Sequence, residues 1–431
     1  MPDLRLLSAR ILQDILEKKH FFTEAKAAFS DNGAPDKAFV NMLVLTALRH
    51  LVFIKKTLRR FVKKKLPAKV AFGEYALILG TAECLYMDTP DYALLNSWVD
   101  ITKKETDKYV AGLVNAVLRK IVAGKSELQK EDKGEFFPPE FFKLLSADYG
   151  TDTAKKIQKA ALAEPALDIT ARQEPHKLAP KLGGTLLPNG SIRLKNGGKI
   201  ENLPEYDDGS WWVQDFAASL AVKTLGKVNG KKILDICAAP GGKTAQLAAG
   251  GAEVTALDVS PARLERLKEN MTRLKLSCHE IICADGIKYL QAQTEPQFDA
   301  VLLDAPCSAT GTIRRHPEIV HIKNTGDIKK QTALQAKFLQ NVGKALKKGG
   351  LLVYCVCSAA KDEGERQIKA FLENNSEFEN LPVTAAELQT MPDGNLREII
   401  TVEGYVRTLP CHLPNDGGCD SFFIARLQKV K

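Results

Sequence analysis

KKILDICAAPGGKT, at residues 231–244, joins a short apolar run to a glycine-rich turn and the start of a helix-like segment. Four further apolar runs follow at 252–259, 278–285, 298–305 and 349–357, with helix-forming segments between them. Buried strands that alternate with helices are typical of a parallel, doubly wound sheet. Ligands on such sheets bind beyond the carboxyl ends of the strands. The sequence therefore predicts an α/β domain whose site lies at those ends.

The glycine-rich turn can hold a nucleotide-like ligand, because adjacent glycines let backbone amides approach closely. Two phosphate-binding motifs fail: a P-loop requires glycine where Cys237 stands, and a dinucleotide loop requires the spacing GxGxxG. A loop for S-adenosyl-L-methionine fits better, since the amino-acid end of that cofactor can meet backbone groups and a lysine. An ordinary tight turn is the alternative. The candidate cofactor residues in the loop are Cys237, Ala238, Ala239, Pro240, Gly241, Gly242 and Lys243.

Acidic residues stand at the ends of the next two predicted strands. Asp258 ends the second strand, where a carboxylate can accept both ribose hydroxyls. Asp285 ends the third strand, where it could accept from an adenine amino group. Each aspartate could instead serve a helix start, and Ser260 and Pro261 form such a start directly after Asp258. The loop and the two aspartates together favour a nucleoside site.

Two of the nine cysteines lie at strand ends beside polar residues: Cys307 follows the fourth strand and Cys357 the fifth. Neighbouring strand ends would bring both thiols together near Asp304. A single buried cysteine is more often a plain core residue, so the setting of these two decides the interpretation. Cys355 is expected to alternate away from Cys357 into the core. Because no CxxC pair occurs, neither a zinc site nor a disulfide framework is expected.

The rest of the chain predicts two further domains. Residues 1–127 should form an all-helical domain, because apolar residues recur three or four positions apart. A linker and a small α/β subdomain with hairpin signals follow at 128–213, and the doubly wound domain occupies 214–431. The net charge is +9, and the stretch KKTLRRFVKKK at 55–65 is dense in lysine and arginine. Either a solvated helix face or an RNA contact explains that stretch.

The composition excludes a membrane protein as the expected class. No apolar run approaches the length of a membrane span, and the charged N-terminus lacks a signal-peptide core. The expectation is a soluble, cytoplasmic protein, which we take to be a monomer.

Several of these motifs resemble the RNA cytosine-5 methyltransferase family of Sun/Fmu-type and NOL1/NOP2/Sun-type enzymes. The resemblance implies a Rossmann-like domain that binds S-adenosyl-L-methionine, with Cys357 as nucleophile and Cys307 as the helper in product release. The N-terminal part looks like the NusB-like RNA-binding domain, which implies 16S rRNA or a small-subunit assembly intermediate as partner. Cofactor contacts are implied for the loop residues named above and for Asp258, Asp285 and Asp304, and Arg263 is expected to join them. The segments that carry the resemblance are DICAAPGGKT, LDVSPARLERLKEN, FDAVLLDAPCSATGTIRRHPEI, GGLLVYCVCS, CDSFFIARL and, towards the N-terminus, EYALILGTAECLYMDTPDYALLNSWVDITK and YVAGLVNAVLRKIV.

Cytosine chemistry explains why such a site would contain a thiolate. Carbon 5 of cytosine is a poor nucleophile until a thiolate adds at carbon 6 and makes it enamine-like. An acid near ring nitrogen 3 must stabilise the adduct, and Asp304 is placed to do so if it carries or shares a proton. Removal of the proton at carbon 5 then releases the thiol, a step that Cys307 could assist. The target base must leave its stack to enter such a pocket.

The sequence departs from the family pattern at a few positions. Val356 stands where the family has threonine before the nucleophile, which puts the rate or the positioning of the base in doubt. Two alternatives remain: a tRNA cytosine-5 methyltransferase with the same chemistry, or a non-catalytic RNA-binding or ribosome-assembly factor on the same fold. The other departures are the segment AAKDEGE at 359–365, the missing aromatic residue after Ile319, and Cys419 and Ser421 near the C-terminus.

Overall fold

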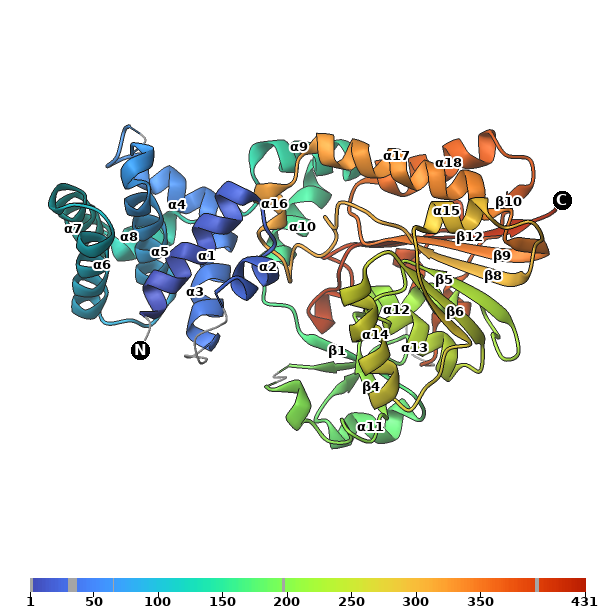
Figure 1. The fold of residues 1–431 in the computed structure, drawn as a ribbon. Helices are drawn as coiled ribbons and strands as arrows, with labels where there is room; N and C mark the ends of the chain where they lie inside the picture. The colour runs from blue at the N-terminus through green and yellow to red at the C-terminus, as the bar shows by residue number, and fades with distance from the viewer. Residues whose placement is uncertain (1–2, 30–36, 65, 196–197, 392–394) are drawn as a thin grey trace. The chain divides into compact units, whose positions relative to one another are not determined.

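The computed structural model describes residues 3–29, 37–64, 66–195, 198–391 and 395–431. The chain divides into two compact units (Figure 1). We call Met1–Ala163 with Ile313–Asn324 the helical unit, and Glu164–Thr312 with Thr325–Lys431 the sheet unit. The short segment 313–324 thus belongs to the helical unit, although it follows the Cys307 loop in the chain.

The helical unit is built around α5, whose residues are almost all buried. Its buried charged residue is Glu83, which is 0% exposed and accepts hydrogen bonds from Arg5 Nη2 at 2.6 Å and Trp98 Nε1 at 2.8 Å. These partners satisfy a carboxylate that would be costly to bury alone. The helices of this unit are α1 (Leu4–Lys18), α2 (Phe22–Ala27), α3 (Lys37–Arg49), α4 (Leu51–Leu58), α5 (Phe72–Tyr86), α6 (Asp91–Glu105), α7 (Lys108–Ala123), α8 (Lys125–Glu131), α9 (Pro139–Tyr149), α10 (Thr151–Leu162) and α16 (Ile319–Ile322).

Among the described residues, no single helix is long and apolar enough to cross a membrane. The pair α3 and α4 would reach that length together, but it is bent by 72°. Buried residues of both helices form part of the apolar core of the helical unit.

The segment 313–324 is held against the helical unit by specific contacts. Ile322 joins the apolar core, and the Phe22 amide donates to Glu318 Oε1 at 3.0 Å. His321 Nε2 lies 2.8 Å from the Leu48 carbonyl oxygen, so it donates in the neutral ring. Burial lowers the pKa of His321 to about 4.

We expect the stability of the helical unit to depend on His321 between about pH 6.5 and 4. In that range the unfolded chain binds a proton that the folded unit excludes, so the free energy of unfolding falls as the pH drops. His321→Gln should show a weaker fall in thermal unfolding experiments, with a difference of at most about 3 kcal/mol. The exposed His176→Gln should keep the wild-type pH dependence. An unchanged pH profile for His321→Gln would contradict the assignment.

The sheet unit begins with a small antiparallel sheet of order β2-β3-β1-β4, with α11 beside it. Arg193 and Asp168 from its central strands form a buried ion pair at 2.6 Å. Its elements are β1 (Leu167–Ala171), α11 (Pro175–Lys181), β2 (Thr185–Leu186), β3 (Ile192–Leu194) and β4 (Trp211–Val213).

The large sheet has the order β10-β12-β9-β8-β5-β6-β7, with β11 paired to β12. β9, β8, β5, β6 and β7 run parallel, and β5 lies where the chain reverses its direction of winding. This confirms the predicted α/β doubly wound class. The antiparallel strands β10, β11 and β12 were not predicted. The remaining elements are α12 (Phe216–Lys223), β5 (Lys232–Ile236), α13 (Gly242–Ala249), β6 (Glu253–Asp258), α14 (Pro261–Arg273), β7 (Glu280–Cys283), α15 (Gly286–Gln291), β8 (Phe298–Asp304), α17 (Thr325–Val342), β9 (Leu346–Val356), α18 (Glu365–Glu373), β10 (Phe378–Asn380), α19 (Ala385–Leu388), β11 (Val406–Thr408) and β12 (Phe422–Lys429).

Two apolar clusters cover the two faces of the large sheet. One packs α12 and α13 against the sheet, and the other packs α15, α17 and α18. Along β9 the side chains alternate between the clusters, as the pleat of a strand requires. Because β5 to β9 run parallel, their carboxyl ends lie at the same edge of the sheet. Every predicted site residue lies at this edge.

Candidate active site

The loop after β5 is shaped by two residues with positive φ. Cys237 has φ of 62° and Gly241 has φ of 103°. A Cβ on Gly241 would lie 3.0 Å from Leu267 Cγ, so a side chain there would be both strained and crowded. α13 starts directly afterwards at Gly242, which directs the first amides of the helix towards the loop. Cys237 thus contributes a left-handed backbone conformation to the loop.

Asp258 ends β6 and is almost fully buried. Its Oδ2 accepts from the Ala239 amide at 3.2 Å and pairs with Arg263 Nη1 at 3.2 Å, and its Oδ1 accepts from the Ser260 amide at 3.0 Å. Arg263 also donates to the Ala239 carbonyl. Arg263 therefore braces both the loop and Asp258. The N-cap residue of α14 is Ser260 and not Asp258, so the role of Asp258 is to bind the loop.

Asp285 follows β7 and caps α15, because its Oδ1 accepts from the amides of Ile287 and Lys288. Within the described residues, its Oδ2 accepts no hydrogen bond and remains available to a ligand. A pocket of about 140 Å³ lies between Asp258 and Asp285. Its other walls are mostly apolar and are formed by Ile236, Cys237, Leu257, Val259, Ala284, Gly286, Ile287, Pro306, Leu334 and Phe338.

This donor set fits the nucleoside end of S-adenosyl-L-methionine. An apolar slot suits a purine ring, and two carboxylates at strand ends suit ribose hydroxyls and an amino group. The amino-acid end would then face the loop amides and Lys243. The residues that would hold the cofactor are therefore the loop 237–243, Asp258 and Asp285.

Lys243 and Asp304 connect the cofactor loop to the cysteines. Lys243 Nζ donates to Asp304 Oδ2 at 2.8 Å and lies 4.9 Å from the centre of the Phe422 ring. Burial would lower the pKa of Lys243, but the negative charge of Asp304 raises it above its usual value. Lys243 also interacts electrostatically with Cys357.

Cys307 and Cys357 meet as predicted, with their sulfur atoms 3.3 Å apart. They follow β8 and β9, which are neighbours in the parallel sheet. The hydrogen bond to Cys357 and burial raise the pKa of Cys307 well above its ordinary value. The two sulfur atoms lie within hydrogen-bond distance, and either thiol can donate to the other.

The expected placement of Cys355 is partly wrong. It is fully buried, as predicted, but it packs against the same apolar cluster as Cys357. Residues two apart on a strand share a face, so it cannot alternate away from Cys357. Val356 is the residue on the opposite face, where it is fully buried in the other cluster. A threonine hydroxyl at position 356 would therefore not lie on the face of the nucleophile.

A buried carboxylate, which the sequence analysis did not single out, ties the two cysteine loops together. Glu363 is fully buried and accepts from the Ser308 amide at 2.8 Å and from Gln335 Nε2 at 3.1 Å. Its Oε2 accepts from the hydroxyls of Ser308 and Ser358, each at 2.5 Å. Ser308 directly follows Cys307, and Ser358 directly follows Cys357. One side chain thus fixes both thiols through the residues next to them.

Gly311 is a second residue that the sequence analysis missed. Its amide donates to the Cys357 carbonyl at 3.0 Å, and its carbonyl accepts from the Ser421 amide at 2.9 Å. A Cβ at this position would lie 2.0 Å from the Ser421 carbonyl oxygen, so only glycine fits. The sequence signal for Gly311 was the run of small residues SATGT after Cys307. The signal for Glu363 was its place in the segment 359–365, which departs from the family pattern.

Two family models match the chain. The model described as 16S rRNA methyltransferase RsmB/F matches residues 222–428, and the NusB family model matches residues 2–123. Ribosomal RNA small subunit methyltransferase B of Pasteurella multocida (strain Pm70) is 32% identical over 450 residues, covering 99% of this chain and 96% of the relative. The protein of the same name from Salmonella arizonae is 32% identical over 444 residues, covering 99% of each.

Solved structures share the fold. The crystal structure of PH0851 matches with a TM-score of 0.78 at 23% identity and covers 100% of this chain and 99% of that one. The structure of NSun6 from Pyrococcus horikoshii with SFG matches with a TM-score of 0.57 at 21% identity and covers 68% and 99%. At these identities the likeness concerns the fold alone.

Proposed function

Because this chain belongs to the family of ribosomal RNA small subunit methyltransferase B, we propose that it methylates carbon 5 of a cytosine in 16S rRNA through Cys357. Members of this family are S-adenosyl-L-methionine-dependent rRNA methyltransferases, and this chain is one of them. The observation that carries the proposal is the pair of thiols 3.3 Å apart, with Lys243 and Asp304 beside them.

The first step in this proposal is addition of the Cys357 thiolate to carbon 6 of the base. The electron pair of the carbon 5–carbon 6 double bond moves into the ring, and Asp304 with Lys243 supplies a proton at ring nitrogen 3. Carbon 5 is then nucleophilic. When bound, S-adenosyl-L-methionine supplies the methyl group that carbon 5 takes.

The second step is release of the product. The proton on carbon 5 leaves, its electron pair restores the carbon 5–carbon 6 double bond, and the bond from carbon 6 to the Cys357 sulfur breaks. Ring nitrogen 3 returns its proton to Asp304. Cys307 is a thiol within hydrogen-bond reach of that sulfur, so it can give its proton to Cys357 and take up the proton from carbon 5. Both thiols are regenerated. The 3.3 Å distance between the two sulfur atoms supports this division of roles.

Cys307→Ser is expected to slow release and to accumulate a covalent protein–RNA species, because serine is a weaker proton donor to the departing sulfur. A denaturing gel would show this species as a band of reduced mobility. The control is Cys283→Ser, because Cys283 is exposed and does not belong to the thiol pair. This variant should behave like the wild type. If Cys307→Ser leaves the amount of adduct unchanged, the two-cysteine mechanism is wrong.

The remaining expectations extend this proposal. We propose that residues 1–127 bind RNA, that 128–213 link them to the catalytic domain at 214–431, and that the protein acts as a cytoplasmic monomer. The physiological substrate would be 16S rRNA or a small-subunit assembly intermediate. Comparing cytosine methylation in rRNA and tRNA of cells with and without the protein tests the choice of RNA.

A further inference from the structure

The basic stretch at 55–65 has two different faces in the structure. On one face, Lys56 pairs with Glu135 at 3.4 Å and Arg60 pairs with Glu131 at 2.5 Å. These partners lie on α8 and just after it, so the charges on this face of the stretch are paired within the helical unit. Such exposed pairs contribute little to stability, but they neutralise the charge of their lysine and arginine.

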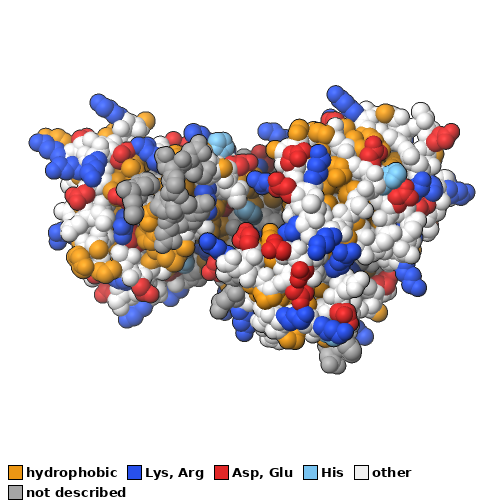
Figure 2. All heavy atoms as spheres, turned by 60° about the horizontal axis from the view of Figure 1, so that its bottom comes forward, with side chains coloured by type: hydrophobic (Ala, Val, Ile, Leu, Met, Phe, Trp, Pro, Cys, Tyr) orange, Lys and Arg blue, Asp and Glu red, His pale blue; other side chains and the backbone are white. Residues whose placement is uncertain are grey.

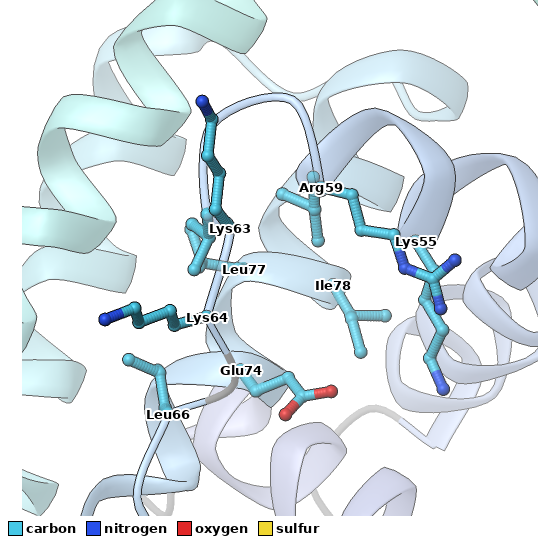
Figure 3. A pocket seen from close by; sticks show the side chains of 10 residues that line it. Lys55, Arg59, Lys63, Lys64, Leu66, Glu74, Leu77 and Ile78 are labelled. Atoms are coloured by element: carbon cyan, nitrogen blue, oxygen red, sulfur yellow. The ribbon is translucent and has the colours of Figure 1, made fainter.

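The other face carries cations that surround a groove of about 320 Å³ (Figure 3). Arg59, Lys63 and Lys64 are exposed, and within the described part of the chain none of the three has an acidic partner. Lys55 lies on the same side of the groove as Arg59, whereas Lys63 and Lys64 rise from the opposite side. Lys65 lies outside the described residues.

The floor of the groove is aliphatic. Leu77 and Ile78 from α5 are only 2% and 1% exposed, and Leu58, Val62 and Leu66 complete the floor. Among the described residues, Glu74 is the one acidic residue that lines it, against four cations. The groove therefore combines an apolar base with a positive rim.

This combination suits one strand of RNA. Phosphates can meet the rim, and the apolar faces of ribose and bases can pack on the floor. The lining contains no aromatic side chain, so bases would pack against aliphatic groups rather than stack, which predicts little sequence preference. On the face shown in Figure 2, basic side chains are interspersed with acidic ones, so the net charge of +9 does not form one continuous patch there. Arg59, Lys63 and Lys64, which have no acidic partner within the described part of the chain, therefore form a distinct local cluster.

We infer that the groove between α4 and α5, lined by Arg59, Lys63 and Lys64, binds a single-stranded segment of the substrate RNA outside the methylated nucleotide. The inference rests on the RNA substrate of the proposed function, but not on its cysteine chemistry. Charge complementarity favours RNA over a protein segment, because the rim cations would otherwise need an acidic peptide.

The test is the salt dependence of RNA binding by the full-length triple variant Arg59→Ala/Lys63→Ala/Lys64→Ala. Binding to naked 16S rRNA is measured without S-adenosyl-L-methionine, in a Cys357→Ser background. Three lost phosphate contacts should reduce the slope of log Kd against log salt by about 2. In the active background, the KM for RNA should rise by roughly 10-fold or more while kcat at saturating RNA stays unchanged.

The matched control is Lys103→Ala/Lys104→Ala/Lys108→Ala, which removes three exposed lysines from α6 and α7 of the same unit. If both triple variants change the salt slope equally, the groove does not bind RNA. The groove variant could instead bind naked rRNA normally and show a methylation defect with the small-subunit particle alone. The groove would then bind a ribosomal protein, and the inference would be overturned. Because binding is read without catalysis, failure of the cysteine mechanism would leave this outcome unaffected.

Discussion

Cys357→Ser is expected to lower methyl transfer by at least about 1,000-fold while S-adenosyl-L-methionine still binds. A serine hydroxyl is not ionised near neutral pH, so it cannot use the positive charge of Lys243 as a thiolate does. The cofactor pocket does not include Cys357 among its walls, so the affinity for the cofactor should stay within a few-fold. Single-turnover methyl transfer and equilibrium cofactor binding measure the two effects separately.

The informative control for this variant is Cys355→Ser. Cys355 shares the face of Cys357, lies 3.5 Å from Asp304 Oδ1 and is fully buried. Its replacement should cost some stability but leave the adduct in place. Near-normal turnover in Cys357→Ser, or loss of the adduct only in Cys355→Ser, would show that Cys357 is not the nucleophile.

Glu363→Gln should lower kcat by about 10- to 100-fold, although Glu363 acts on the two cysteines only through Ser308 and Ser358, the residues that follow them. Its carboxylate accepts three hydrogen bonds that hold Ser308 and Ser358, and a fourth from Gln335 Nε2. In glutamine, one oxygen becomes an NH2 group that faces existing donors. The loops should then shift, and misplacement of reacting groups by about 1 Å costs roughly 100-fold in rate. The free energy of unfolding should fall by about 1–3 kcal/mol, as for a buried donor left without an acceptor.

Kinetics distinguish this positioning role from a general loss of stability. The KM for S-adenosyl-L-methionine should stay unchanged, because Glu363 is absent from the cofactor pocket. Asp362→Asn is the matched control, since Asp362 is the preceding residue and its side chain is exposed and paired with Arg366. Full activity in Glu363→Gln at a temperature where it is folded would show that the two loops hold their geometry without the carboxylate.

The strand ends were predictable from sequence because they obey a local rule. Apolar runs alternate with helices, and parallel strands place their carboxyl ends at one edge, so Cys307 and Cys357 had to approach each other. The cofactor loop was equally visible, because its adjacent glycines and Lys243 follow the first strand directly.

Contacts between residues far apart in the sequence were not predictable in the same way. Glu363 stands in an exposed-looking polar segment, and only the folded chain shows that Ser308 and Ser358 converge on it. The packing of 313–324 with the helical unit likewise depends on contacts to residues nearly 300 positions away, such as Glu318 with Phe22. The pairing of Lys56 and Arg60 with acids near α8, which separates the two faces of the basic stretch, is of the same kind.

The central claim is that Cys357 forms a covalent bond to the target cytosine, and the most direct test uses 16S rRNA that contains 5-fluorocytidine. Fluorine at carbon 5 cannot leave as a proton, so the adduct cannot be resolved after methyl transfer. Digestion and fragment mass spectrometry should find one methylated fluorocytidine on Cys357, distinguished from Cys355 in the same peptide. An active enzyme that yields no covalent product, or a nucleotide attached to Cys307 instead, would contradict the account.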